Sequence, residues 1–131
     1  MVIDSSALVA IVLEEPEAGA LVDAIAASPV RAVAAPTLVE ATAALLRRKG
    51  ARGRELLLRF LQSADVHVVP MTAEAAESAC DACTYYGKGV GSPGVLNFGD
   101  CLAYGVVAAL GEPLLFKGDD FPRTDVVAAS Y

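Results

Sequence analysis

Several acidic side chains fall where folding could bring carboxylates together. Asp4 follows the apolar run Met1-Val2-Ile3, at the point where a first strand would end. Asp119 and Asp120 follow the last apolar run of the chain. In an open α/β sheet, ligands bind just beyond the carboxyl ends of the strands. We therefore expect these acids to reach one edge of a sheet.

Two further acids, Glu40 and Asp100, fall in the first turns of expected helices. Each has an ordinary interpretation, because Thr37-x-x-Glu40 and Asn97-x-x-Asp100 both have capping-box spacing. Asp4 would similarly serve as a helix cap. Taken together, carboxylates at one edge raise each other's pKa values unless a cation lies among them. Mg²⁺ suits oxygen ligands that leave room for water and phosphate, so the set predicts a divalent metal site.

The segments that must position these acids alternate along the chain. Apolar runs predict strands at residues 2–4, 31–35, 66–69 and 113–116, with an edge strand in 125–131. Helices are expected at 6–13, 17–27, 36–48, 54–63, 72–86 and 97–110, with a basic turn at 49–53 and a glycine-rich loop at 87–94. This order predicts one α/β domain over residues 1–131, a three-layer α/β/α sandwich with a mostly parallel sheet of four to five short strands.

Composition narrows the class of protein. The chain is 55% hydrophobic and carries a net charge of −6. Because it has no run of about 18 apolar residues and no secretion signal, we expect a cytoplasmic protein without a membrane span. The three cysteines, an odd number, argue against a disulfide framework, and the pair in Cys80-Asp81-Ala82-Cys83 is expected to be small buried apolar residues.

Six of the ten basic residues lie between positions 47 and 59. Arg47 follows Glu40 by seven residues, so the two lie about 10 Å apart on one helix. Arg47, Arg48 and Lys49 are candidates to hold a phosphate group near these acids. A solvated helix end is an equally open interpretation.

Four segments carry a resemblance to a known family. They are Val2-Ile3-Asp4-Ser5-Ser6-Ala7-Leu8, Pro36-Thr37-Leu38-Val39-Glu40, Asn97-Phe98-Gly99-Asp100-Cys101-Leu102-Ala103-Tyr104 and Leu114-Leu115-Phe116-Lys117-Gly118-Asp119-Asp120-Phe121. In order and spacing, over the whole chain, they resemble PIN-domain ribonucleases of the VapC type, the toxin half of bacterial toxin–antitoxin pairs.

The resemblance assigns roles to individual residues. Asp4, Glu40 and Asp100 match the family's metal-binding acids, and Asp119 best matches the fourth. The last motif is compressed relative to the commoner family form, so Asp120 stays an alternative for the metal-facing position. By the same resemblance, Ser6 and Asn97 match polar positions that support the site.

The resemblance also implies an activity and partners. It implies an endoribonuclease that uses Mg²⁺, accepts Mn²⁺, and leaves 5′-phosphate and 3′-hydroxyl ends. A VapB-type antitoxin and a homodimer are further expectations. The expected helix at 54–63 gives the homodimer some support, because Leu56, Leu57, Leu58, Phe60 and Leu61 hold more apolar surface than one helix face buries. An overfilled monomer core is the alternative explanation.

Two other functions stay open from the residues alone. A receiver-type phosphoacceptor domain is also small and α/β, but it needs a paired acid after the first strand, where this chain has Ser5 and Ser6. A non-catalytic protein-binding module of the same fold would use the acids only to attract a basic partner. Titration with Mg²⁺ separates the module from the enzyme.

Overall fold

A parallel sheet forms the centre of the computed structural model, which describes all residues from 1 to 131. Its strands are β1 (Val2–Ile3), β2 (Ala32–Ala34), β3 (His67–Val69) and β4 (Leu114–Leu115), in the order β3-β2-β1-β4. Every pairing is parallel. The carboxyl ends of all four strands therefore meet at one edge, as the predicted fold requires. The tail supplies one isolated bridge, from Leu114 to Ala128, in place of the expected edge strand.

Six α-helices and one short 3₁₀ helix connect the strands. They are α1 (Ser5–Val12), α2 (Ala18–Ala27), α3 (Ala35–Lys49), α4 (Ala51–Ser63), α5 (Ala73–Tyr86), α6 (Phe98–Leu110) and the 3₁₀ helix η1 (Phe121–Arg123). The expected basic turn at 49–53 is shorter than predicted. Gly50, with φ of 59°, reverses the chain alone, so α4 begins at Ala51.

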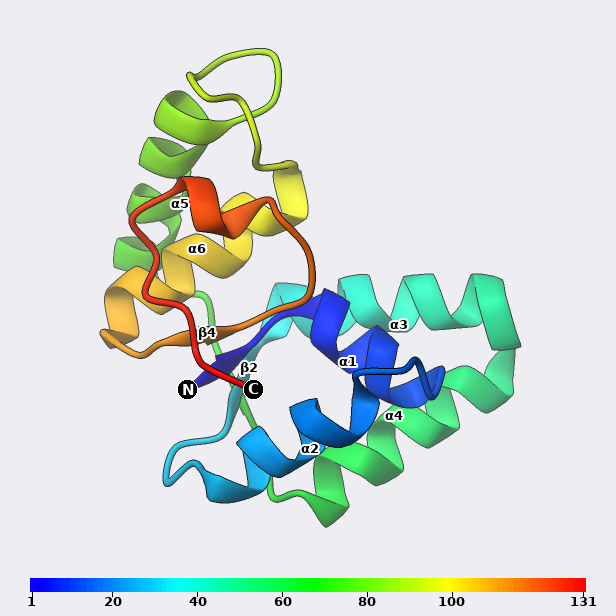
Figure 1. Cartoon of the computed structure of the whole chain (residues 1–131). Coiled ribbons are helices and arrows are strands. Elements are labelled where there is room, and N and C mark those ends of the chain that lie inside the picture. The colour runs from blue at the N-terminus through cyan, green and yellow to red at the C-terminus, as the bar shows by residue number, and fades with distance from the viewer.

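The sheet separates two helical layers, as Figure 1 shows. Successive strand residues point to opposite faces. Ile3, Val33 and Leu115 join the core formed with α1, α2, α3 and α4. Val2 and Leu114 point the other way and join the core formed with α5 and α6. The predicted three-layer α/β/α architecture is confirmed.

The apolar residues of α4 mostly serve this core. Leu57 and Leu61 are buried, and Leu56 and Phe60 pack partly buried against the same cluster. Only Leu58 is exposed, so α4 does not supply the excess apolar surface expected for a dimer.

The cysteines differ from one another in burial. Cys101 is buried and Cys83 is partly so, but Cys80 is exposed, which makes the prediction wrong for that residue. None of the helices combines the length and apolar character needed to cross a bilayer.

Candidate active site

Four carboxylates influence one another at the carboxyl edge of the sheet. Asp4 raises the pKa of both Glu40 and Asp100. Asp120 raises the pKa of Asp4 and Asp100, and Glu40 raises that of Asp100. The topology explains why these acids gather. Asp4 and Asp120 follow β1 and β4, and Glu40 lies on α3, which begins directly after β2. Asp100 lies at the N-terminus of α6, which runs antiparallel to β4 and therefore begins at this edge.

Asp4 is the most deeply buried of these acids, at 2% exposure. It caps α1, and its Oδ2 accepts hydrogen bonds from Ser6 N at 2.9 Å and Ser6 Oγ at 2.6 Å. Its Oδ1 is buried and has no hydrogen-bond partner. Burial raises the pKa of Asp4, against the lowering effect of the bonds from Ser6 and Ser5, and Asp120 raises it further. A buried acceptor without a donor is unusual and calls for a ligand.

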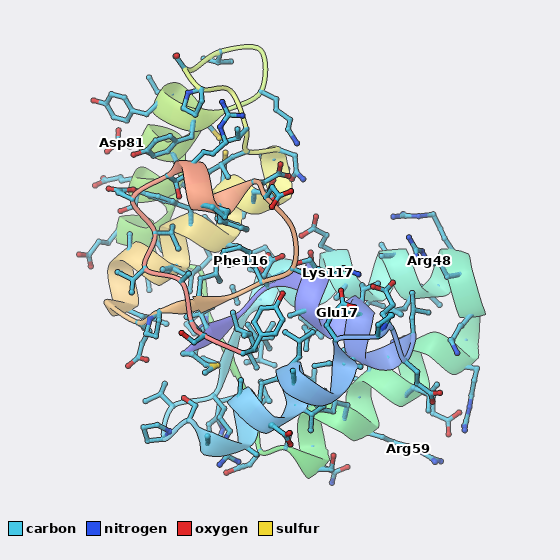
Figure 2. The ribbon with its side chains drawn as sticks, in the orientation of Figure 1. Glu17, Arg48, Arg59, Asp81, Phe116 and Lys117 are labelled. Carbon is cyan, nitrogen blue, oxygen red and sulfur yellow. The ribbon has the colours of Figure 1, made fainter.

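Ser6 joins Asp4 to the loop after β4. Its hydroxyl accepts a hydrogen bond from Lys117 N at 3.0 Å while it donates to Asp4. The Lys117 ammonium in turn pairs with Glu15 and Glu17 in the connection between α1 and α2. Figure 2 shows Lys117 and Glu17 next to each other. Ser6 therefore holds two chain segments in register at the site.

Glu40 does not close the predicted capping box. Helix α3 begins at Ala35, its N-cap Ala34 makes no side-chain cap bond, and the Thr37 hydroxyl is buried without a partner. The prediction of a Thr37–Glu40 box is therefore wrong, because the helix starts earlier than the Pro36 signal suggested.

The Glu40 carboxylate lies instead against Gly99 in the first turn of α6. A Cβ added to Gly99 would stand 2.2 Å from Glu40 Oε1 and 2.6 Å from Oε2. Burial raises the pKa of Glu40, a hydrogen bond from the Ser5 side chain lowers it, and Asp4 raises it. Because Ser5 and Gly99 lie in the first turns of α1 and α6, Glu40 lies near two helix N-termini, whose dipoles favour negative charge.

Asp100 and Asn97 form the predicted capping box. Asn97 Oδ1 accepts from Asp100 N at 3.0 Å, and Asp100 Oδ2 accepts from Asn97 N at 2.7 Å. Asp100 is 8% exposed. Burial, more than the charges of Asp4, Asp120 and Glu40, raises its pKa to about 6, although the Asn97 bond lowers it. One carboxylate oxygen is held by the cap, while Oδ1 takes part in no protein hydrogen bond.

The two tandem acids after β4 have different surroundings. Asp119 is exposed, and its charge does not contribute to the raised pKa of Asp4 or Asp100. Asp120 is half-buried and pairs with Lys88 at 3.2 Å. Gly118, with φ of 111°, turns the chain so that Asp120, the second of the pair, lies near Asp4 and Asp100.

The donor atoms of the acid cluster decide whether it can hold a metal ion. No three carboxylate, thiol or imidazole side chains converge closely enough to chelate an ion as they stand. Three carboxylates each bond a protein donor: Asp4 to Ser6, Asp100 to Asn97 and Asp120 to Lys88. The remaining oxygens include the unpaired Asp4 Oδ1, and an oxygen-only donor set suits a hard cation. A hard divalent cation would be shared by these carboxylates only after side-chain rotation.

An apolar surface adjoins Glu40. A pocket of about 430 Å³ lies between α3 and α6, and its lining residues are Pro36, Val39, Glu40, Phe98, Gly99 and Leu102. Val39 and Phe98 are 69% and 75% exposed. Exposed apolar groups gathered beside a charged site are typical of an interaction surface.

The basic segment lies apart from the acids. Arg47, Arg48 and Lys49 are exposed in the last turn of α3, at the tip of the α3–α4 hairpin (Figure 1). Arg48 approaches Glu15 at 3.8 Å, whereas Arg47 and Lys49 form no ion pair. The three charges therefore face solvent, beyond the acid cluster along α3.

Sequence reasoning missed three residues of the site. Ser5 and Gly99 position Glu40, and Lys88 pairs with Asp120. A glycine inside a helical pattern was the one available signal for Gly99, since such a residue usually has a packing reason.

Comparisons with known proteins match the chain to one family along nearly its whole length. The model of the PIN domain family matches residues 1–127. Ribonuclease VapC of Mycolicibacterium smegmatis is 43% identical over 128 residues, 98% of each chain. Ribonuclease VapC42 of Mycobacterium tuberculosis is 40% identical over 126 residues, 96% of each chain. Among solved structures, the Mycobacterium tuberculosis sarcin-ricin loop cleaving toxin VapC20 shares the fold, with a TM-score of 0.77, 22% identity, and coverage of 96% of this chain and 95% of that one.

Proposed function

We propose that this chain, which belongs to the PIN-domain family and is a VapC-type ribonuclease, cleaves RNA at a divalent metal ion held by Asp4, Asp100 and Asp120 with Glu40 beside them. The observation that carries the proposal is the buried, unpaired Asp4 Oδ1 within a group of mutually repelling carboxylates. A bound cation would supply the partner that Asp4 Oδ1 lacks and would relieve the repulsion between the carboxylates. We assign the fourth acid position to Asp120 and not to Asp119, because of the two only Asp120 raises the pKa of Asp4 and Asp100.

The oxygen-only donor set favours Mg²⁺, with Mn²⁺ accepted in its place. When bound, such an ion supplies Lewis acidity and lowers the pKa of a coordinated water. The protein's own contribution is orientation. Ser6 holds Asp4 through Oδ2 and leaves Oδ1 buried without a partner, and the Asn97 backbone N–H holds Asp100 through Oδ2. Glu40 lies on α3 with its carboxylate against Gly99 of α6, and the charge of Asp4 adds to its raised pKa.

The RNA backbone needs positive charge beyond the acid cluster. Arg47, Arg48 and Lys49 supply it on the helix that carries Glu40, about 10 Å further along. At that distance they reach a phosphate next to the one that is cleaved. Since Arg47 and Lys49 have no ion-pair partner, they can bind phosphate without breaking a protein contact.

The proposed partners are a VapB-type antitoxin and a second copy of the chain, in the cytoplasm. Val39 and Phe98 form the exposed apolar surface that supports a protein contact beside Glu40. Sedimentation of the purified protein tests the homodimer, and Phe98→Glu should shift a dimer to monomer. A wild-type protein that sediments as a monomer at micromolar concentration would contradict it.

Cleavage of end-labelled RNA tests the proposed activity. Wild-type protein should cut in Mg²⁺ and leave 5′-phosphate ends, and it should be inactive in EDTA. Activity that persists in EDTA would refute the metal mechanism. If the protein instead shows neither cleavage nor stabilisation by Mg²⁺, the non-catalytic binding module is the better account.

The receiver-type alternative has less support. Such a domain needs a second acid beside Asp4, and the two residues that follow it are Ser5 and Ser6. The Ser6 hydroxyl donates a hydrogen bond to Asp4, and the Ser5 side chain lowers the pKa of Glu40.

A further inference from the structure

Lys88 is the one basic side chain that pairs with a carboxylate of the acid cluster. Its ammonium lies 3.2 Å from Asp120 Oδ2. The two side chains are 52% and 46% exposed. A half-exposed ion pair of this kind contributes little stability, so Lys88 can leave Asp120 at small cost.

The loop that carries Lys88 is packed firmly against the elements around it. A Cβ on Gly87 would stand 2.3 Å from Cys83 O, and one on Gly91 would stand 2.2 Å from Tyr85 O. Only glycine permits such close approach to the end of α5. Lys88 N also donates to Leu96 O at 2.8 Å, just ahead of the Asn97 cap of α6. The backbone of Lys88 is thus fixed while its side chain stays free to turn.

The other lysine near the site is held differently. Lys117 pairs with two carboxylates, Glu15 and Glu17, which neutralise it and direct it away from the acids. Lys88 has a single partner, Asp120, and a metal ion bound at the cluster would compete with Lys88 for that carboxylate. Among the lysines, only Lys88 is therefore both close to the cluster and released when the cluster binds an ion.

The charge balance of the site requires such a cation. Four carboxylates and one divalent ion leave a net charge of about −2, and an RNA phosphate adds more negative charge. Preorganised cations at a transferring phosphate are a large source of transition-state stabilisation.

We propose that Lys88 is a catalytic residue that moves from Asp120 to a non-bridging oxygen of the scissile phosphate when metal and RNA bind. This inference rests on the proposed ribonuclease function. Lys88 remains protonated throughout and exchanges no proton with the RNA. Its ammonium stabilises the charge that builds up on the phosphate oxygens during attack.

Three variants test the role. Lys88→Met removes the charge, and Lys88→Arg keeps it. Arg59→Met is the matched control, because it removes one exposed charge from α4 far from Lys117 (Figure 2). The measurements are single-turnover RNA cleavage in saturating Mg²⁺, the salt dependence of kcat/KM, and the Mg²⁺ concentration that half-maximally raises Tm in the absence of RNA.

Lys88→Met should slow cleavage roughly 100-fold. It should also reduce the slope of log kcat/KM against log salt by about 0.7, the value for one contact with a single strand. The Mg²⁺ midpoint of the thermal titration should stay equal or fall, because Asp120 loses a competing cation. Lys88→Arg should recover most of the cleavage rate, and Arg59→Met should match wild type.

Two results would overturn the role while leaving the ribonuclease intact. One is cleavage by Lys88→Met within twofold of wild type. The other is a joint loss of cleavage and Mg²⁺ affinity with an unchanged salt slope, which would make Lys88 a support for Asp120 only. A wild-type protein that does not cleave RNA in Mg²⁺ would remove the proposed function, and this role with it.

Discussion

Replacing Gly99 with alanine should separate activity from stability. A Cβ at this position would stand 2.2 Å from Glu40 Oε1, so the carboxylate must retreat by about 1.2 Å to reach the 3.4 Å limit of ordinary contact. The obstructing atom is the far end of a flexible side chain, and Glu40 is only half-buried, so the helix itself need not move. Alanine also favours a helix over glycine by up to about 1 kcal/mol.

The expected result is a folded but impaired enzyme. A displacement of about 1 Å at a catalytic group can lower the rate about 100-fold, which corresponds to about 2.7 kcal/mol of lost transition-state stabilisation. Tm should be unchanged or slightly higher. The assay is single-turnover RNA cleavage in Mg²⁺ together with thermal unfolding of the same preparations.

Two other glycines provide the controls. Gly19 occupies the same second position in α2, and a Cβ there would meet nothing within 4 Å, so Gly19→Ala should leave both activity and stability intact. A Cβ added to Gly105 would stand 2.1 Å from the backbone oxygen of Ala75, so Gly105→Ala should lower Tm strongly. Cleavage by Gly99→Ala at the wild-type rate would show that the position of Glu40 does not matter. A loss of Tm like that of Gly105→Ala would show that Glu40 cannot give way.

Three further predictions concern the acids and the basic segment. Asp4→Asn and Asp100→Asn should each lower Mg²⁺-dependent cleavage at least ~100-fold. Each should also abolish the rise of Tm with Mg²⁺ without lowering Tm in EDTA. If Tm of a variant still rises with Mg²⁺, the residue changed in that variant is not a metal ligand. Folding raises the pKa of Asp100 from 3.8 to about 6, so the folded protein binds the proton more tightly than the unfolded chain. The metal-free protein should therefore lose stability as pH rises between these values, and Asp100→Asn should flatten that part of a Tm–pH curve, while an identical curve would contradict the assignment. Changing Arg47, Arg48 and Lys49 together to glutamine should reduce the salt slope of RNA cleavage by about 2, and an unchanged slope would assign these charges to solvation alone.

The sequence predicted the architecture well because its signals are local and repeat along the chain. Short apolar runs, separated by helical periodicity, specify a parallel sheet covered on both faces. The strand-end position of Asp4 and the Asn97–Asp100 capping box were predicted correctly for the same reason, since neighbours in sequence indicate both.

The remaining details depend on contacts between distant segments. The sequence offered Glu40 a cap with Thr37 beside the metal-binding role that the resemblance implies, but its carboxylate lies against Gly99, 59 residues further along the chain. No local pattern encodes that approach.

The choice between Asp119 and Asp120 likewise depends on the direction of one turn. Gly118 sets this direction through its positive φ. The ion pair of Lys88 with Asp120 joins a loop to a turn 32 residues away, which spacing alone does not reveal.

The most direct test of the central claim is the anomalous scattering of Mn²⁺ in crystals of the wild-type protein. The account predicts an anomalous peak bounded by the carboxylates of Asp4, Asp100 and Asp120, with Asp4 Oδ1 among the ligands. The same experiment on Asp4→Asn should lose the peak. A Mn²⁺ ion bound elsewhere, or none at saturating concentration, would contradict the account.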